Sequence, residues 1–274
     1  MTILFAGLDH IATLRQAGGS RDPDPVIAAA LAELAGAGGV SISLGRERPP
    51  PRALRQAQGF AVSAQPNGPE QGRGTQAEGS EMQERDLRLL RETARCPVNV
   101  CLPPLDEWVK LALAVRPDLV TLTPEGREGL GAERCLDVED RRQELWPVID
   151  TLRSGGIGVS VLVEPAPAQV KAAQRAGAGA VLLDCARYCW AGDAATRAAE
   201  LERLVNAAMI GHRLGVAVHA GGGLNYQTVG QVAQVPEIEA VHVGHGLIAR
   251  AVLVGVGEAV RELLRNLAGN GSRR

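Results

Sequence analysis

Two glycine-rich runs in the carboxyl-terminal part of the chain could bind a phosphate group. They are Ala220-Gly-Gly-Gly-Leu224 and Gly244-His-Gly-Leu247, and each follows a short apolar run. Glycine permits positive φ angles and close backbone approach, so amide N–H groups can point at an anion beside a helix N-terminus. The same residues would also suit two tight turns. Their place after two expected strands favours the phosphate site.

Asp9 and His10 form a second candidate site, because they directly follow the first apolar run of the chain. A carboxylate beside an imidazole can orient the ring and hold its tautomer, or accept a hydrogen bond from a sugar hydroxyl. The alternative is a capped turn with a surface histidine. The residues alone favour neither interpretation.

A metal centre and a Schiff-base lysine are both disfavoured by the sequence. His242 and His245 lie three residues apart, but no third ligand is evident beside them. Lys110 and Lys171 are the two lysines, and both fall in stretches with helical periodicity. An imine-forming lysine would have to lie at the site itself. We therefore expect neither kind of chemistry.

Eight short apolar runs are expected to form strands, and most are followed by a segment with helical periodicity. Strands that are buried on both faces read as nearly continuous apolar runs. Asp24 and Pro25 suit the start of the first long helix, as N-cap and first helical residue. The expected strands span residues 3–8, 40–44, 98–102, 118–122, 157–163, 180–184, 216–219 and 241–243.

Eight such units in 274 residues match a closed, eight-stranded parallel β/α (TIM) barrel. An open doubly wound sheet is the alternative, because a pattern gives the strand count and not the closure. In barrels of this type, sites form at the carboxyl ends of the strands, and the loops after strands seven and eight often hold phosphate. Both glycine-rich runs fall in those loops. We expect one barrel domain over residues 1–268.

Residues 45–82 interrupt this alternation. They are rich in Gly, Pro, Gln, Arg and Ser and carry little periodic apolar content. Long ordered loops without secondary structure are uncommon, so the segment is expected to be either disordered or a lid over the site. Its composition favours disorder. Residues 269–274 are expected to be a disordered tail.

Charge and composition exclude several classes of protein. Lys and Arg number 29 and Asp and Glu 31, whereas a broad nucleic-acid surface needs a basic face. No apolar run reaches the roughly 18 residues of a membrane span, and the first residues lack the basic start of a signal peptide. The five cysteines have no regular spacing and are expected to be reduced thiols. We expect a soluble, cytoplasmic protein.

A series of short motifs along the chain points to one known family. The most specific is Leu8-Asp-His-Ile-Ala-Thr-Leu-Arg15, followed by Asp22-Pro-Asp-Pro25. The others, in order, are Thr123-Pro-Glu125 with Arg127, Leu136-Asp-Val138, Ala220-Gly-Gly-Gly-Leu224 with Tyr226, and Val243-Gly-His-Gly-Leu-Ile248 with Arg250. Together they resemble the pyridoxine 5'-phosphate synthases of vitamin B6 biosynthesis, over nearly the whole chain apart from the 45–82 segment.

The resemblance implies a β/α barrel with extra helices that assembles into homo-oligomers, from dimer to octamer. It implies a transferase reaction on phosphorylated small molecules. In that reaction 3-amino-2-oxopropyl phosphate and 1-deoxy-D-xylulose 5-phosphate condense to pyridoxine 5'-phosphate, inorganic phosphate and water. No metal or organic cofactor is implied. Each step moves protons, so positioned acids and bases are needed.

The substrate-binding positions of the family are present in this chain. By resemblance, Asp9 and His10 contact the deoxyxylulose phosphate. Gly223, Gly244 and His245 match the positions that hold the phosphate of the amino-ketone.

The catalytic positions of the family are altered. Ser43 stands where the family has a His at the end of strand two, and Cys101 stands where strand three has a Glu. Gly222 replaces the His of the loop after strand seven. The loss of one general acid or base typically costs about 10² to 10⁴ in rate. His219, where the family has Asn, could partly replace the missing histidine.

Four supporting positions also differ: Gly7 replaces an Asn, Gly18 an Arg, Gly131 a Thr and Leu182 a Glu. Two hypotheses of different class follow. The chain either retains pyridoxine 5'-phosphate synthesis, or is a diverged paralogue. The paralogue would run altered chemistry on a phosphorylated small molecule, or bind a phosphate ligand as an inactive pseudoenzyme.

Overall fold

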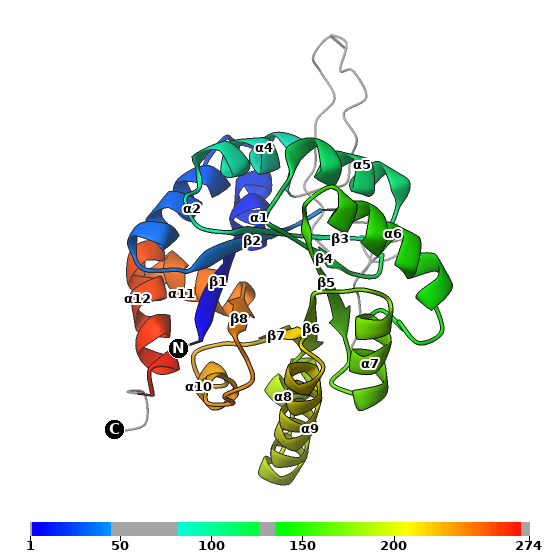
Figure 1. Cartoon of the computed structure of the whole chain (residues 1–274). Helices are drawn as coiled ribbons and strands as arrows, with labels where there is room; N and C mark the ends of the chain where they lie inside the picture. Colours follow the sequence, from blue (N-terminus) through cyan, green and yellow to red (C-terminus); the bar gives the residue numbers. More distant parts are fainter. Residues whose placement is uncertain (1, 45–81, 126–134, 270–274) are drawn as a thin grey trace, which may run out of the picture.

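Eight parallel strands form a closed barrel at the centre of the computed structural model, which describes residues 2–44, 82–125 and 135–269 (Figure 1). Each strand pairs with its neighbours in the chain, and β8 pairs with β1, so the expected TIM barrel is confirmed and the open sheet is excluded. The strands are β1 (Ile3–Gly7), β2 (Gly39–Ser43), β3 (Val98–Leu102), β4 (Leu119–Leu122), β5 (Gly158–Val163), β6 (Ala180–Asp184), β7 (Ala217–Gly221) and β8 (Ala240–Val243).

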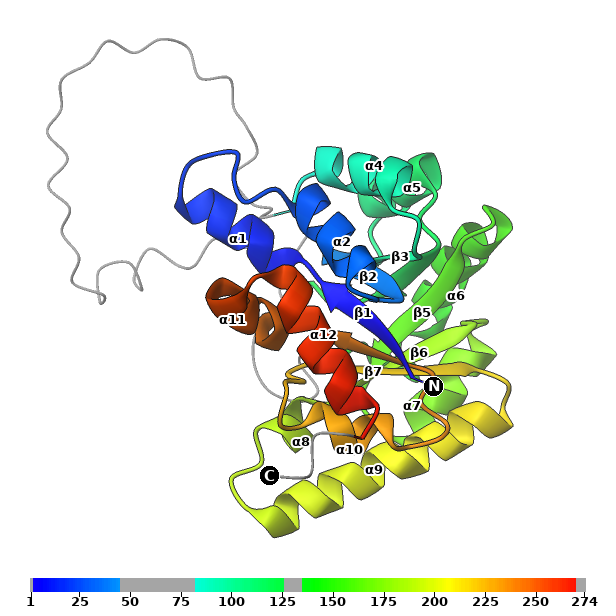
Figure 2. The same ribbon diagram turned by 90° about the vertical axis from the view of Figure 1, so that its left-hand side faces the viewer.

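Helices surround the barrel on its outer side (Figures 1 and 2). Among them, α1 and α11 follow β1 and β8 and lie side by side (Figure 2). The helices are α1 (Asp9–Ala17), α2 (Pro25–Leu34), α4 (Glu84–Thr93), α5 (Asp106–Val115), α6 (Arg142–Ser154), α7 (Pro167–Arg175), α8 (Ala186–Cys189), α9 (Ala194–Arg213), α10 (Val229–Ala233), α11 (His245–Val254) and α12 (Val256–Leu267).

Helix α2 shows how local sequence sets the boundaries of an element. The Asp24 side chain accepts a hydrogen bond from the Val26 amide at 2.8 Å and so caps the helix. Pro25 occupies the first turn, where a missing N–H costs nothing. Gly36, at φ 104°, then turns the chain into β2. The expected start of this helix, with Asp24 as N-cap and Pro25 as first helical residue, is therefore confirmed.

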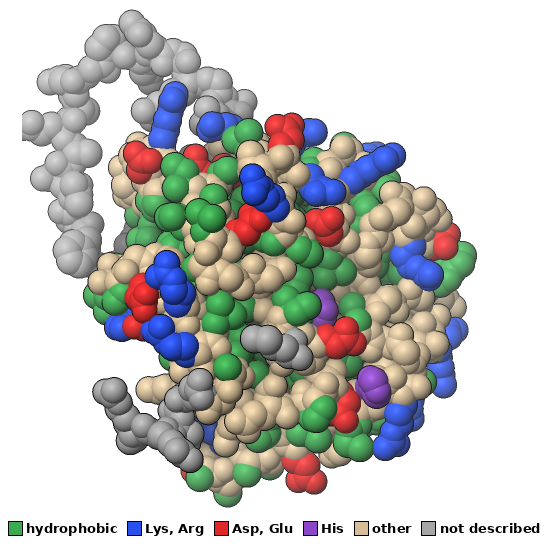
Figure 3. All heavy atoms as spheres, turned by 60° about the vertical axis from the view of Figure 1, so that its left-hand side comes forward, with side chains coloured by type: hydrophobic (Ala, Val, Ile, Leu, Met, Phe, Trp, Pro, Cys, Tyr) green, Lys and Arg blue, Asp and Glu red, His purple; other side chains and the backbone are tan. Residues whose placement is uncertain are grey.

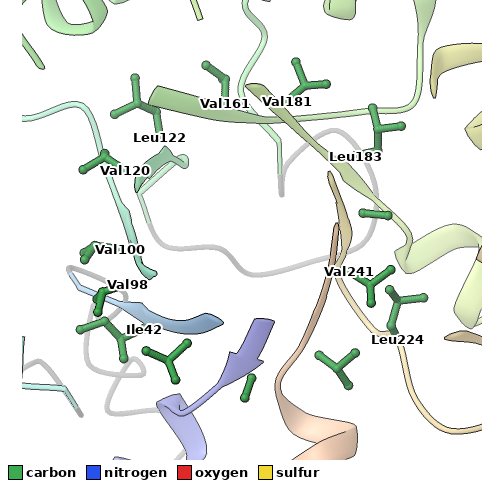
Figure 4. Close-up of a cluster of buried hydrophobic side chains, with 14 of the residues drawn as sticks. Ile42, Val98, Val100, Val120, Leu122, Val161, Val181, Leu183, Leu224 and Val241 are labelled. Atoms are coloured by element: carbon green, nitrogen blue, oxygen red, sulfur yellow. The ribbon is translucent and has the colours of Figure 1, made fainter. Parts of the chain in front are cut away.

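The main hydrophobic core lies between the barrel and its helices. Outward-facing side chains such as Val100, Val120, Val161 and Val181 pack there, and all four are fully buried (Figure 4). Successive side chains of a strand point to opposite faces of the sheet. The alternate residues of the same strands therefore point into the barrel.

The barrel interior is more polar than expected from strands that form nearly continuous apolar runs in the sequence. Asn99 Nδ2 donates a hydrogen bond to Ser41 Oγ at 2.9 Å, and Thr121 Oγ1 donates to Asn99 Oδ1 at 2.8 Å. All three side chains are buried, and Ser160 of β5 is buried at an inward position too. Interiors of such barrels are commonly filled by bulky branched residues. Here short polar side chains line part of the interior below the carboxyl ends of the strands.

One strand ends later than expected, and two expected segments lie mostly outside the described residues. β7 continues to Gly221, two residues beyond its expected end, because Gly221 pairs with both Asp184 and His242. The expected 45–82 segment lies outside the described residues except for Met82, which is buried. Of the expected tail, only Gly269 is described. None of the described helices is long and apolar enough to cross a membrane.

Candidate active site

The amino ends of α1 and α11 meet at the carboxyl end of the barrel and bring two predicted site residues together. His10 lies in the first turn of α1 and His245 begins α11. Their rings are 5.0 Å apart between centroids, at 79° to each other. The approach depends on Gly7, because a methyl group there would lie 2.7 Å from the Cα of Gly244. A larger side chain at position 7, such as the Asn that the resemblance implies for the family, therefore does not fit this backbone without a shift.

Asp9 is hydrogen-bonded to Ser43, the last residue of β2. The Ser43 amide donates to Asp9 Oδ1 at 2.6 Å, and Ser43 Oγ donates to Asp9 Oδ2 at 2.9 Å. Hydrogen bonds to an ionised carboxylate are among the stronger ones in proteins. The structure thus joins a predicted substrate-binding residue to a position where the resemblance predicts an altered catalytic side chain.

The two glycine-rich runs also lie against each other. A methyl group at Gly246 would lie 2.9 Å from Leu224 O and from Asn225 Cβ, so a glycine is needed where α11 meets the loop after β7. Gly223 adopts φ 82°, and its Cβ would lie 3.2 Å from Cys189 Cβ. Backbone amides at a helix N-terminus beside such a loop form a ready anion site. The packing places both predicted phosphate-binding runs at one location.

Gly222 adopts φ 89°, and its neighbour across the strands is Asp184. A Cβ at Gly222 would overlap the Oδ1 atom of Asp184. Asp184 ends β6 and is 5% exposed. A side chain at position 222, such as the His that the resemblance implies for the family, has no room beside this carboxylate.

Cys101 lies inside the barrel, in register with Ser43 of the adjacent strand. Its Sγ atom accepts from Asn99 Nδ2 at 3.6 Å and lies 3.9 Å from Ser41 Oγ. The thiol is 5% exposed, so the position of the missing Glu is part of the buried polar network.

His219 also points into the barrel, but it lies nearer to the amino ends of the strands than Gly222 does. Its Nδ1 atom is 3.2 Å from Nε2 of His242, and the ring of Phe5 stacks on His242 at 4.6 Å. Burial lowers the pKa of His219 to about 4, because the charged form loses its hydration. His219 thus contacts His242 at a lower level of the barrel and does not take the place of a side chain at position 222.

The remaining predicted positions are distributed as follows. Gly18 caps the end of α1, and Leu182 packs inside the barrel. Gly131 and Arg127 lie outside the described residues. His242 and His245 are separated, with one inside the barrel and the other at its rim. In the part of the chain that the structure describes, no three His, Cys, Asp or Glu side chains are arranged to hold a metal ion.

The sequence analysis did not identify Asp184 as a site residue, and it did not predict the ion pair between Arg15 and Asp86. Arg15 Nη1 and Nη2 donate to the two carboxylate oxygens of Asp86 at 2.9 and 2.7 Å, which fixes α1 to α4 beside the site. Asp184 shares a strand face with Leu182, two residues earlier, so the period of two could have identified it as inward-facing. No local signal identifies the partner of Arg15.

Comparison with known protein families decides the relationship of this chain. The model of the family described as "Pyridoxal phosphate biosynthesis protein PdxJ" matches residues 4–56 and 77–269. The chain belongs to this family. The resemblance inferred from its motifs is therefore confirmed, and pyridoxine biosynthesis is the setting of its relatives.

Curated relatives of this PdxJ family member carry one name. "Pyridoxine 5'-phosphate synthase" of Syntrophotalea carbinolica is 43% identical over 263 residues, which cover 96% of this chain and 97% of that protein. The protein of the same name from Synechococcus sp. is 41% identical with the same coverage. That of Geobacter metallireducens is 39% identical, over 96% of this chain and 98% of its own.

Solved structures with a similar fold are more distant in sequence. N-(5'-phosphoribosyl)anthranilate isomerase from Pyrococcus furiosus aligns with a TM-score of 0.55 and 14% identity, over 98% of this chain and all of its own. A tryptophan synthase alpha-subunit from the same organism gives 0.56 and 14%, over 98% and 97% of the two chains. At this identity they support the barrel fold alone.

Proposed function

We propose that this PdxJ family member catalyses pyridoxine 5'-phosphate synthesis. The reaction condenses 3-amino-2-oxopropyl phosphate with 1-deoxy-D-xylulose 5-phosphate. The observation that carries the proposal is the relationship to named synthases over nearly the whole chain. The geometry supports it, because Asp9, His10, Gly244 and His245 lie together at the end of the barrel where such sites form.

Two groups of residues at the carboxyl end of the barrel each bind one of the two phosphorylated substrates. Gly223, Gly244 and His245 hold the phosphate of the amino-ketone, with backbone amides and an imidazole as donors. Asp9 and His10 contact the deoxyxylulose phosphate, whose hydroxyl groups are suitable donors and acceptors. The proposed reaction uses no metal or organic cofactor.

A second candidate function is phosphate-ligand binding without turnover. The specific observation in its favour is the loss of all three family catalytic side chains at Ser43, Cys101 and Gly222. Ser43 is bonded to Asp9, and Gly222 has no room for a side chain. In that case the rim would still bind phosphorylated ketones, but proton transfer would be lost.

We also propose that the protein is cytoplasmic and assembles with copies of itself. The support for self-assembly is the exposed apolar face of α2. Ile27, Leu31 and Leu34 share this face and are 60, 45 and 84% exposed, respectively. Figure 3 shows the side of the molecule that includes α2, where hydrophobic side chains are exposed among charged ones. Exposed apolar surface of this kind is typical of an interface. The molar mass of the unmodified chain, compared with that of Leu34→Lys by sedimentation, tests the assignment.

The purified chain, supplied with both substrates, tests the proposed reaction. Release of inorganic phosphate together with pyridoxine 5'-phosphate supports the synthase, as does growth without added B6 of a bacterial strain that lacks its own synthase. Binding of both substrates by calorimetry without product supports the second candidate. Absence of both binding and product contradicts both functions.

A further inference from the structure

Asp184 places a carboxylate at the mouth of the barrel, between the ends of β6 and β7. It is an inward-facing residue, because Leu182 packs inside the barrel and Leu183 packs in the outer core. It pairs in register with Gly221, directly before Gly222. Its Oδ2 atom accepts a long hydrogen bond from the Ala186 amide at 3.4 Å. The carboxylate is therefore held at the same end of the barrel as the predicted phosphate site.

The space beside Asp184 is the space that a side chain at position 222 would enter. A Cβ on Gly222 would overlap Asp184 Oδ1 and lie 3.2 Å from Asp184 Cγ. Real Cβ atoms do not approach a carboxylate oxygen so closely. Position 222 can keep its conformation next to Asp184 as a glycine, and φ 89° also favours glycine there. The two residues are thus sterically linked.

Building on the proposed function, we propose that Asp184 is the proton carrier of this enzyme, in the place of the histidine that the family has at position 222. The resemblance implies a carboxylate at position 182 of the family, where this chain has the apolar Leu182. Asp184 stands two residues further along the same face of β6, one step nearer the mouth. The Asp184 carboxylate therefore lies between positions 182 and 222, the two positions where the resemblance implies missing side chains.

Three other candidates for this role, Ser43, His219 and Cys101, are engaged elsewhere. Ser43 donates its hydroxyl to Asp9, and a hydroxyl is a poor base at neutral pH. His219 contacts His242 lower in the barrel, and its pKa is lowered to about 4 by burial. Cys101 contacts Asn99 within the buried network. A carboxylate at the mouth is better placed to reach a bound substrate.

The proposed step is the removal of water from the condensed substrate. The Asp184 carboxylate takes a proton from a carbon, and the electron pair of that C–H bond forms a C=C bond. The C–O bond on the adjacent carbon breaks, and the hydroxyl group leaves. The protonated carboxyl then gives its proton to the leaving group, which departs as water. Asp184 ends the step as it began, and no oxidant or reductant is consumed.

Asp184→Ala tests the role, because it removes the carboxyl and opens a space that formate can enter. We expect the alanine variant to lose about 10²- to 10⁴-fold in kcat, with its Kd for inorganic phosphate within about threefold of the unmodified chain. Added formate should restore at least about tenfold in rate, in a saturable manner. Asp184→Asn leaves no such space and should lose activity without rescue. Asp150→Asn, on the exposed side of α6, is the matched control. It should keep the kcat of the unmodified chain, and added formate should not change its rate.

The outcomes separate the two proposals. An alanine variant with nearly full activity, or with lost activity that formate does not raise, overturns the role of Asp184 while the synthase stands. If the alanine variant does not fold, Asp184→Asn decides, and activity within about threefold of the unmodified chain overturns the role. Absence of turnover in the unmodified chain overturns the proposed function, and the role of Asp184 with it.

Discussion

The carboxylate of Asp9 accepts two hydrogen bonds from Ser43, one from its amide at 2.6 Å and one from its hydroxyl at 2.9 Å. The two residues lie 34 positions apart in the chain. Asp9 is also the first residue of α1, where a negative charge is favoured by the helix dipole. This contact therefore joins the amino end of α1 to the carboxyl end of β2.

The unequal hydrogen bonds of this pair give a first prediction, for the free energy of unfolding. Ser43→Ala removes the hydroxyl bond and keeps the amide bond, so we expect a loss of about 1 kcal/mol. Asp9→Ala removes both acceptors and leaves the Ser43 amide without its carboxylate, so we expect about 2–3 kcal/mol. Urea denaturation of both variants measures the difference. Equal losses in the free energy of unfolding would contradict the inference that Asp9 accepts two stabilising hydrogen bonds from Ser43.

The stability of the fold should depend on pH through His219. Burial lowers its pKa from an ordinary value of 6.5 to about 4, so between these values the unfolded chain binds a proton that the folded chain does not. The free energy of unfolding therefore falls as the pH falls through this window, by about 1–3 kcal/mol from this residue. His219→Asn should flatten the pH dependence. The exposed His212 provides the control, since His212→Asn should leave it unchanged.

The glycine at position 223 should be required for both stability and phosphate binding. Its φ of 82° disfavours any side chain, and a Cβ would press on Cys189 at 3.2 Å. We expect Gly223→Ala to cost about 1–2 kcal/mol and to weaken the binding of inorganic phosphate, measured by calorimetry. Gly192→Ala is the matched control, because a Cβ there would meet nothing within 4 Å. If Gly223→Ala binds phosphate with unchanged affinity, the loop that contains Gly223 is not part of the anion site.

The buried ion pair of Arg15 with Asp86 should matter far more than an exposed pair on the same helix. The two side chains are 12 and 2% exposed, and Asp86 Oδ2 also accepts from the Gln83 amide at 3.0 Å. Asp86→Ala leaves a guanidinium without its partner, so we expect a loss of about 3 kcal/mol. Glu84→Ala breaks the exposed pair with Arg88 and should cost at most about 0.5 kcal/mol. Thermal unfolding of the two variants compares them, and similar losses would be the contrary result.

The order and type of the elements could be predicted from the sequence, because they depend on neighbouring residues. Asp24 and Pro25 set the start of α2 through contacts within a single turn. The eight apolar runs became eight strands, with ends displaced by at most two residues. The prediction that Ser43, Cys101 and Gly222 occupy altered catalytic positions also came from motif position alone.

The tertiary structure alone decided which strand face points into the barrel and which distant residues meet there. Alternation along a strand divides its side chains into two faces, but only the pairing of β8 with β1 makes one of them an interior. The contact of Asp9 with Ser43 and the overlap of Asp184 with Gly222 both cross between strands. Such contacts depend on register and closure, which arise from interactions between segments far apart in the chain and leave no local pattern.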